Sequence, residues 1–202
     1  MLFRSSFVIL LFFFCFPVTI AKPKTFIHPT LQKQFTFKLS FLTLTLSAPQ
    51  QQHSDKRITK ECLQPFLQIL RRKYKCQSYI WRAEKQKNGN IHYHITSDVY
   101  LPYDQIRDDW NNCQNKLDFI NRFEQQHGHR NPNSTDIHSV RRIKDLARYM
   151  IKYMSKDTPQ ALKVGCKLWD CSQNLKTKEH VDIILDSSNC DLYQALKYTT
   201  SC

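Results

Sequence analysis

The chain has 202 residues, enough for one domain with a modest core plus extensions, and its 30 Lys and Arg against 17 Asp and Glu give a formal net charge of +13. This positive excess is spread along the chain, which favours a polyanionic partner, nucleic acid or an acidic membrane surface, over a basic protein without one. The chain has 3 Gly and no G-x-x-x-x-G-K-[ST] sequence, so a P-loop NTPase domain is excluded.

Residues 1–34 read as a hydrophobic extension, with one early arginine and an apolar run from Phe7 to Ala21. The run resembles a secretory signal peptide and is short for a membrane span. Three interpretations stay open: a start upstream of the natural one, a membrane-proximal anchor, and a secreted protein. The chain also has 8 Cys, none in C-x-x-C spacing. We expect mostly buried free thiols in a reducing compartment, whereas secretion would make these residues available for disulfides.

The first predicted elements of the folded part are a strand and a helix. Residues 37–47 alternate between apolar side chains and threonines such as Thr43 and Thr45, which predicts a strand with one buried face. Apolar residues then recur at helical spacing over 55–75, where Pro65 either kinks the helix or starts a second one.

The next elements alternate between strands and helices. Residues 76–84 and 90–99 read as two strands around an Asn-Gly turn. They are followed by a helix over 102–117, a polar loop over 123–135, a strand over 136–143, a third helix over 144–157 and a strand or hairpin over 163–172. This order predicts an α+β fold, in which helices pack on a mainly antiparallel sheet.

Two histidines in the predicted hairpin are candidate metal ligands. His92 and His94 lie two apart on one strand, so both side chains project from the same face and can chelate one ion. A two-residue turn would place Glu84 opposite Tyr93, on the other face. A three-residue turn with Gly89 in the left-handed conformation would place Glu84 opposite His92, and we predict this second register. The alternative is a pair of exposed polar histidines without a metal.

The other histidines give weaker signals. His127 and His129 form a second His-x-His, but they lie in a Gly- and Asn-rich segment without a strand to fix their geometry, so we do not expect a ligand pair. His138 lies on the strand predicted over 136–143, and alternation does not show which face it takes.

The predicted third helix carries two tyrosines and two lysines on one side. At about 100° per residue, Tyr149, Lys152, Tyr153 and Lys156 fall within one stripe, beside an apolar stripe. Each tyrosine therefore has a lysine nearby, and an adjacent ammonium favours the phenolate form and neutralises a phosphate. The arrangement suits phosphoryl transfer. The alternative is an amphipathic basic helix whose rings only pack.

Three segments together resemble a known family. FLTLTLS, IHYHI and YMIKYMSK, in this order and at these intervals, resemble the three motifs of HUH endonucleases, the rolling-circle replication initiators called Rep. The runs SYIWRAEKQKNGNIHYHI and NPNSTDIHSV look like the replication-associated proteins of microviruses and filamentous phages. The similarity covers roughly residues 36–175. It implies the HUH nuclease fold, a central antiparallel sheet of about five strands with flanking helices, similar to ferredoxin and RRM folds.

The resemblance implies a role for each candidate residue. His92 and His94 would bind a divalent ion, Mg2+ or Mn2+, with Glu84 as third ligand. Tyr149 or Tyr153 would attack a phosphodiester of single-stranded DNA, leaving a 5′-phosphotyrosine link and a free 3′-hydroxyl. Lys152 and Lys156 would assist this step.

The resemblance also sets expectations about organisation and partners. The nuclease domain would span 35–175, and 176–202 would be a C-terminal tail whose truncation stays open. The partners would be single-stranded origin DNA, a host helicase and a polymerase, with no nucleotide cofactor, in the cytoplasm of a bacterial host. Because a secretory signal conflicts with that location, we prefer an upstream start for residues 1–34.

Other functions fit parts of the sequence. A transposase or mobilisation relaxase would use the same chemistry on different DNA. A non-catalytic single-stranded nucleic-acid-binding module would present Trp81 and Tyr93 for base stacking. A secreted disulfide protein would lose its structure on reduction.

Overall fold

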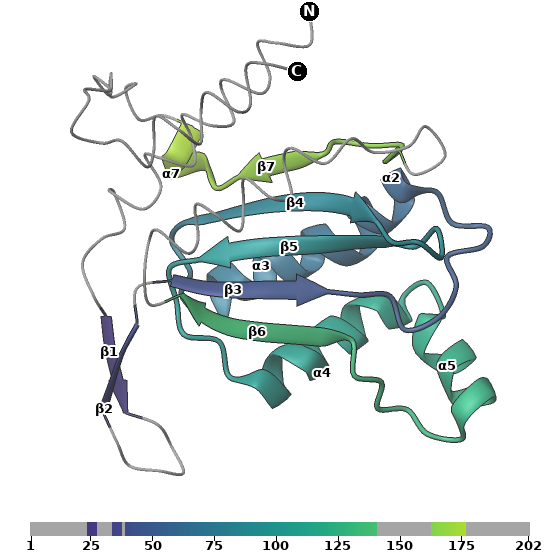
Figure 1. Ribbon diagram of the computed structural model, residues 1–202, viewed down its shortest axis with the longest axis horizontal. Coiled ribbons are helices and arrows are strands. Elements are labelled where there is room, and N and C mark those ends of the chain that lie inside the picture. Colours follow the sequence, from purple (N-terminus) through teal and green to yellow (C-terminus); the bar gives the residue numbers. More distant parts are fainter. Residues whose placement is uncertain (1–23, 28–33, 38, 141–162, 177–202) are drawn as a thin grey trace, which may run out of the picture.

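The computed structural model describes residues 24–27, 34–37, 39–140 and 163–176. Its main feature is an antiparallel sheet with strand order β6-β3-β5-β4-β7 (Figure 1). The strands are β3 (Leu39–Leu44), β4 (Tyr79–Lys85), β5 (Ile91–Ser97), β6 (Thr135–Val140) and β7 (Trp169–Cys171). With helices flanking this five-stranded sheet, the predicted α+β fold class is confirmed.

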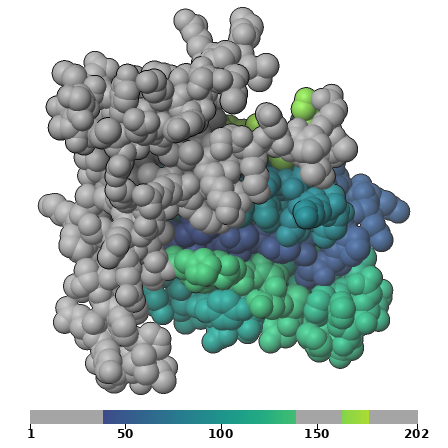
Figure 2. All heavy atoms as spheres, in the orientation of Figure 1, coloured from purple at the N-terminus to yellow at the C-terminus, as the bar shows by residue number. Residues whose placement is uncertain are grey.

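A second, smaller sheet precedes the main one. Strands β1 (Lys24–Ile27) and β2 (Gln34–Phe37) pair antiparallel with each other. The remaining described elements are helical: α2 (Asp55–Ile58), η1 (Thr59–Leu63), α3 (Gln64–Arg72), α4 (Tyr103–Asn115), α5 (Phe119–His127) and α7 (Gln173–Lys176). Figure 1 shows α2, α3 and α4 on one face of the main sheet. The space-filling view of Figure 2 has the same orientation, with β3 in purple bordered by β6 in green.

The first helical segment stays continuous through Pro65. Ser54 caps its start, because the Ser54 hydroxyl accepts a hydrogen bond from the Arg57 backbone N–H at 3.2 Å. The π-helical turn η1 then precedes Pro65, which lies in the first turn of α3. Proline has no N–H and its ring clashes with the carbonyl four residues earlier, so the wider turn accommodates it without ending the helix.

The core lies between the sheet and the helices. Trp81 and Tyr93 project from neighbouring strands onto the helix-covered face, with their rings edge to face at 6.1 Å. The Tyr93 ring also meets the Trp110 ring of α4, which in turn packs on Phe66 of α3. Trp81 is 2% exposed and Tyr93 0% exposed. The suggestion that these two rings stack on bases is therefore wrong, because strand alternation turns both of them into the core.

The hairpin between β4 and β5 has the predicted register. Gln86 N–H donates to the Asn90 carbonyl at 2.8 Å, and Gly89 N–H donates to the Gln86 carbonyl at 2.9 Å. Gly89 has φ +84°, the left-handed conformation that closes a three-residue loop with a bulge. Glu84 lies directly opposite His92 as a result, and the predicted three-residue turn is confirmed.

One helix was missed in the sequence. The polar segment predicted as a loop over 123–135 starts inside α5, which ends at His127. Gly128 caps this helix with φ +74°, and Phe119 and Ile120 bury its first turn. The polar composition hid the helix, because these two apolar residues alone anchor it to the core.

Several predictions fall on residues outside the described ranges. They include the third helix over 144–157, the tail from residue 177 and the apolar run from Phe7 to Ala21. Within the described part, no helix has the length and apolar character needed to cross a membrane. The five described cysteines, Cys62, Cys76, Cys113, Cys166 and Cys171, are free thiols, as expected for a chain without disulfides.

Candidate metal centre

Three predicted ligands meet on the face of the sheet opposite the helices. Glu84 comes from β4, and His92 and His94 come from β5. The Glu84 Oε2 atom lies 3.6 Å from His92 Nε2 and 3.4 Å from His94 Nε2. All three potential ligand atoms lie within 4.8 Å of one another, so the cluster could hold one metal ion.

Burial distinguishes this cluster from a chance group of surface side chains. The side chains of Glu84, His92 and His94 are 23%, 15% and 9% exposed. Glu84 Oε2 and His92 Nε2 are buried atoms without a hydrogen-bond partner among the described residues. Buried polar atoms without partners are rare and costly in proteins, and a cation bound between them would satisfy both.

The strand next to β5 orients the His94 ring. Thr43 lies opposite His94, and its Oγ1 is 3.2 Å from His94 Nδ1. If Nδ1 carries the proton and donates to Thr43, Nε2 keeps its lone pair toward Glu84, as a ligand must. Phe41 stacks on the same imidazole, with ring centroids 5.6 Å apart and planes 24° from parallel. The sequence predicted a structural role for Thr43, and the contact gives that role a specific form.

The local electrostatics favour the metal-binding forms of the ligands. Contacts with His92, and then with His94, hold the pKa of the Glu84 carboxyl well below its usual range. Burial lowers the pKa of His94, with Glu84 opposing the shift. The donor set is therefore a carboxylate with an imidazole that burial keeps neutral, which suits a divalent cation. Two imidazoles and one carboxylate also leave coordination positions open for other ligands.

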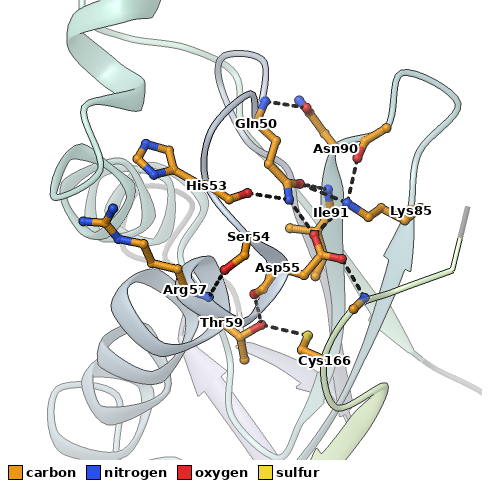
Figure 3. Close-up of polar contacts among 12 residues, drawn as sticks. Gln50, His53, Ser54, Asp55, Arg57, Thr59, Lys85, Asn90, Ile91 and Cys166 are labelled. Atoms are coloured by element: carbon orange, nitrogen blue, oxygen red, sulfur yellow. Dashed lines mark hydrogen bonds and ion pairs between the residues drawn. The ribbon is translucent and has the colours of Figure 1, made fainter.

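A polar network fixes the turn that sets this register (Figure 3). The Lys85 ammonium forms an ion pair with Asp55 at 2.6 Å and donates to the Gly89 carbonyl at 2.8 Å. Gln50 accepts from the Ile91 N–H at 2.8 Å and donates to Asp55 at 2.5 Å. We call Gln50, Asp55 and Lys85 the turn clamp. It ties the start of α2 to the hairpin, and nothing in the sequence pattern indicated it.

Two further side chains on this face were not singled out in the sequence. Arg82 lies directly opposite His94 on one side and Trp169 on the other. Both Arg82 and Trp169 are half-buried. Burial lowers the pKa of Arg82, and the negative charge of Glu84 opposes this shift. Their place beside the ligands depends on the pairing of β7 with β4, which strand alternation alone does not predict.

The remaining histidines do not join the cluster. His138 shares the sheet face with His94, but it is exposed and its Nε2 lies 2.9 Å from Asp136 Oδ2. His127 ends α5, and both His127 and His129 contact the Phe123 ring. This agrees with the expectation that the second His-x-His is not a ligand pair. Among the described residues, Glu84, His92 and His94 form the one cluster with metal-ligand geometry.

The predicted nucleophile helix lies outside the described residues. Tyr149, Lys152, Tyr153 and Lys156 all fall in 141–162, so their roles and their distance from the cluster stay predictions.

The comparison with protein families gives one match. Residues 39–158 match the model of a family described as replication-associated protein, ORF2 type. The match includes β3, the hairpin with its three clustered side chains, β6 and the segment with the two tyrosines. The searches of curated proteins and of solved structures gave no significant match. Because the matched residues make up more than half of the chain, and because the resemblance to rolling-circle Rep proteins rests on the same segments, the chain belongs to this family of ORF2-type replication-associated proteins.

Proposed function

We propose that this protein initiates replication by metal-dependent nicking and joining of single-stranded DNA at an origin. The observation that carries the proposal is the convergence of Glu84, His92 and His94 on one sheet face. It occurs in a member of a replication-associated family, and the matched residues also contain the Tyr149 and Tyr153 helix predicted from the sequence. The formal charge of +13 supports a polyanionic substrate.

The donor set supports Mn2+ or Mg2+ as the ion. Imidazoles suit manganese better than magnesium, which prefers oxygen ligands. Three protein ligands leave positions for water and for a phosphate oxygen, as cleavage requires. When bound, the ion supplies Lewis-acid polarisation of the scissile phosphate.

The proposed chemistry is a pair of phosphoryl transfers. The phenolate oxygen of Tyr149 or Tyr153 attacks the phosphorus, the bond from phosphorus to the 3′-oxygen breaks, and the leaving oxygen takes a proton to become a 3′-hydroxyl. The 5′-phosphoryl group stays on the tyrosine. Joining reverses these steps: a 3′-hydroxyl attacks the phosphotyrosine, and the tyrosine oxygen leaves and regains its proton. The ammonium groups of Lys152 and Lys156 favour the phenolate and offset charge on the phosphate.

We assign this activity to residues 35–175. Since the chain has no P-loop motif, unwinding of the template falls to a separate helicase, and extension of the 3′-hydroxyl falls to a polymerase.

Covalent attachment to labelled single-stranded origin DNA in the presence of Mn2+ tests the proposal. We expect a protein–DNA adduct that disappears with a chelator and in the double variant Tyr149→Phe, Tyr153→Phe. An adduct formed by that double variant would show that the tyrosine assignment is wrong.

The second His-x-His of the chain provides a matched control for the metal site. The variant His92→Ala, His94→Ala should lose the adduct, whereas His127→Ala, His129→Ala should keep it. Equal adduct yields from these two variants would contradict a metal role for the hairpin histidines.

A further inference from the structure

Arg82 occupies a central place on the sheet face that carries the metal cluster. Its strand neighbours Trp81 and Ala83 are 2% and 1% exposed and point into the core, so alternation turns Arg82 toward the opposite face with Glu84. It lies directly opposite His94, and paired positions on neighbouring strands have Cβ atoms about 4.5–5.5 Å apart. A long guanidinium side chain at this place can reach anything bound next to His94.

The guanidinium has no partner that explains its burial. No hydrogen bond or ion pair joins Arg82 to any residue that the structure describes, although the side chain is half-buried. The nearest carboxylate influence comes from Glu84, which acts on Arg82 through space and already contacts both histidines. Removing a cation from water without a partner is unfavourable, so such a group is expected where an anion binds.

The charge balance of the face indicates the sign of that anion. The Glu84 carboxylate carries −1, the two imidazoles are uncharged as metal ligands, and Arg82 carries +1. A divalent ion brings the face to a net charge of about +2, which one carboxylate does not offset. A phosphodiester carries −1 and presents two free oxygens, the geometry that the planar guanidinium fork binds with two parallel hydrogen bonds.

We propose that Arg82 binds a non-bridging phosphate oxygen of the DNA strand next to the metal ligands and so positions the backbone at the cluster. This inference rests on the proposed function for its substrate, but it concerns binding, which can be measured without cleavage. Arg82 is in this sense a binding residue for the phosphodiester and takes no part in forming or breaking bonds.

The test compares Arg82→Gln and Arg82→Lys with Arg71→Gln, which removes an equal charge from the exposed surface of α3 on the helix side of the sheet. Affinity for a single-stranded oligonucleotide is measured over a range of salt concentrations, and Mn2+ affinity is titrated separately on the same proteins. Arg82→Gln should lose about 10–100-fold in DNA affinity, and the slope of log K against log salt should fall by about 0.7, the value for one lost contact on a single strand.

The other measurements separate the possible reasons for a loss. Arg82→Lys keeps the charge and the apolar stem but lacks the fork, so it should lose about tenfold, and it tests the contact if Arg82→Gln fails to fold. Mn2+ affinity should be unchanged in every arginine variant, because none of them removes a ligand. A folded Arg82 variant that binds DNA with wild-type affinity and salt slope would overturn the inference. Failure of the wild-type protein to form a covalent adduct would instead count against the proposed function, and it would leave the binding comparison readable.

Discussion

Removing the charge of Lys85 tests whether the turn clamp is a buried ion pair on which the hairpin depends. The Lys85 and Asp55 side chains are 12% and 7% exposed, and their charged atoms are 2.6 Å apart. Lys85→Met keeps most of the apolar stem and removes the ammonium, so Asp55 is left as a buried carboxylate with Gln50 and the Gly165 N–H as its remaining donors. Breaking a buried pair from one side costs roughly 3–5 kcal/mol, a large part of the ~5–15 kcal/mol that stabilises a typical domain.

Urea denaturation at neutral pH measures this loss, with a matched control on the surface. Lys73→Met removes a lysine whose ammonium is 2.8 Å from Asp109, but the Lys73 side chain is 48% exposed, so we expect a change of about 0–1 kcal/mol. Adding Asp55→Asn to Lys85→Met removes the buried charge and should recover part of the loss. A loss for Lys85→Met as small as that for Lys73→Met would refute the argument that the pair is desolvated.

Acid provides an independent check on the same pair. Burial alone raises the pKa of Asp55, but hydrogen bonds from Lys85, Gly165 and Gln50 outweigh it, so the net shift is downward. The carboxylate therefore stabilises the fold above the unfolded pKa of about 3.9, and this contribution disappears as the pH falls through the lowered native pKa. Without Lys85 the native carboxyl pKa is higher. The stability difference between wild type and Lys85→Met should accordingly narrow as the pH falls below about 4, and a difference that stays constant would contradict this assignment.

Two further substitutions test the register and the orientation of the cluster. Gly89→Ala should destabilise the protein by about 1 kcal/mol, because alanine is strained at φ +84° although no atom lies within 4 Å of the added Cβ. Gly165→Ala, whose Cβ would meet Asp55 at an ordinary 3.5 Å, should cost less in the same urea titration, and the reverse order would contradict the bulge. Thr43→Val should lower Mn2+ affinity about 10–100-fold by removing the partner of His94 Nδ1, with little change in Tm. Thr45→Val is its control, and equal Mn2+ affinities in the two valine variants would exclude orientation of His94 by Thr43.

The hairpin could be predicted from sequence because its determinants are local. Strand alternation places His92 and His94 on one face, and a single glycine in the loop decides whether Glu84 joins them. Both rules act over fewer than a dozen residues, and neither depends on the rest of the fold. The same locality explains why the strand containing Thr43 was predicted from its alternation alone.

The features that sequence reasoning missed all depend on distant residues. The turn clamp links Asp55 to Lys85 and to Gly165, 30 and 110 residues away along the chain. The importance of Arg82 appears only when β7 pairs with β4. Alternation specifies which residues share a face, but strand order and side-chain networks are set by packing across the whole domain, which a local pattern does not contain.

The register of the hairpin is determined more than once, and this redundancy bears on function. A slip by one residue would turn Glu84 away from the histidines and move Trp81 and Tyr93 out of the core, where they are almost fully buried. Exposing two large aromatic side chains costs roughly 1.5–3 kcal/mol each, before the loss of the Lys85 ion pair is considered. The metal ligands themselves contribute little to this preference, because their Coulomb and hydrogen-bonding needs are met only when an ion binds. The core and the turn clamp therefore hold a ligand set that would not hold itself, which is the arrangement expected when geometry at the centre serves binding and catalysis more than stability.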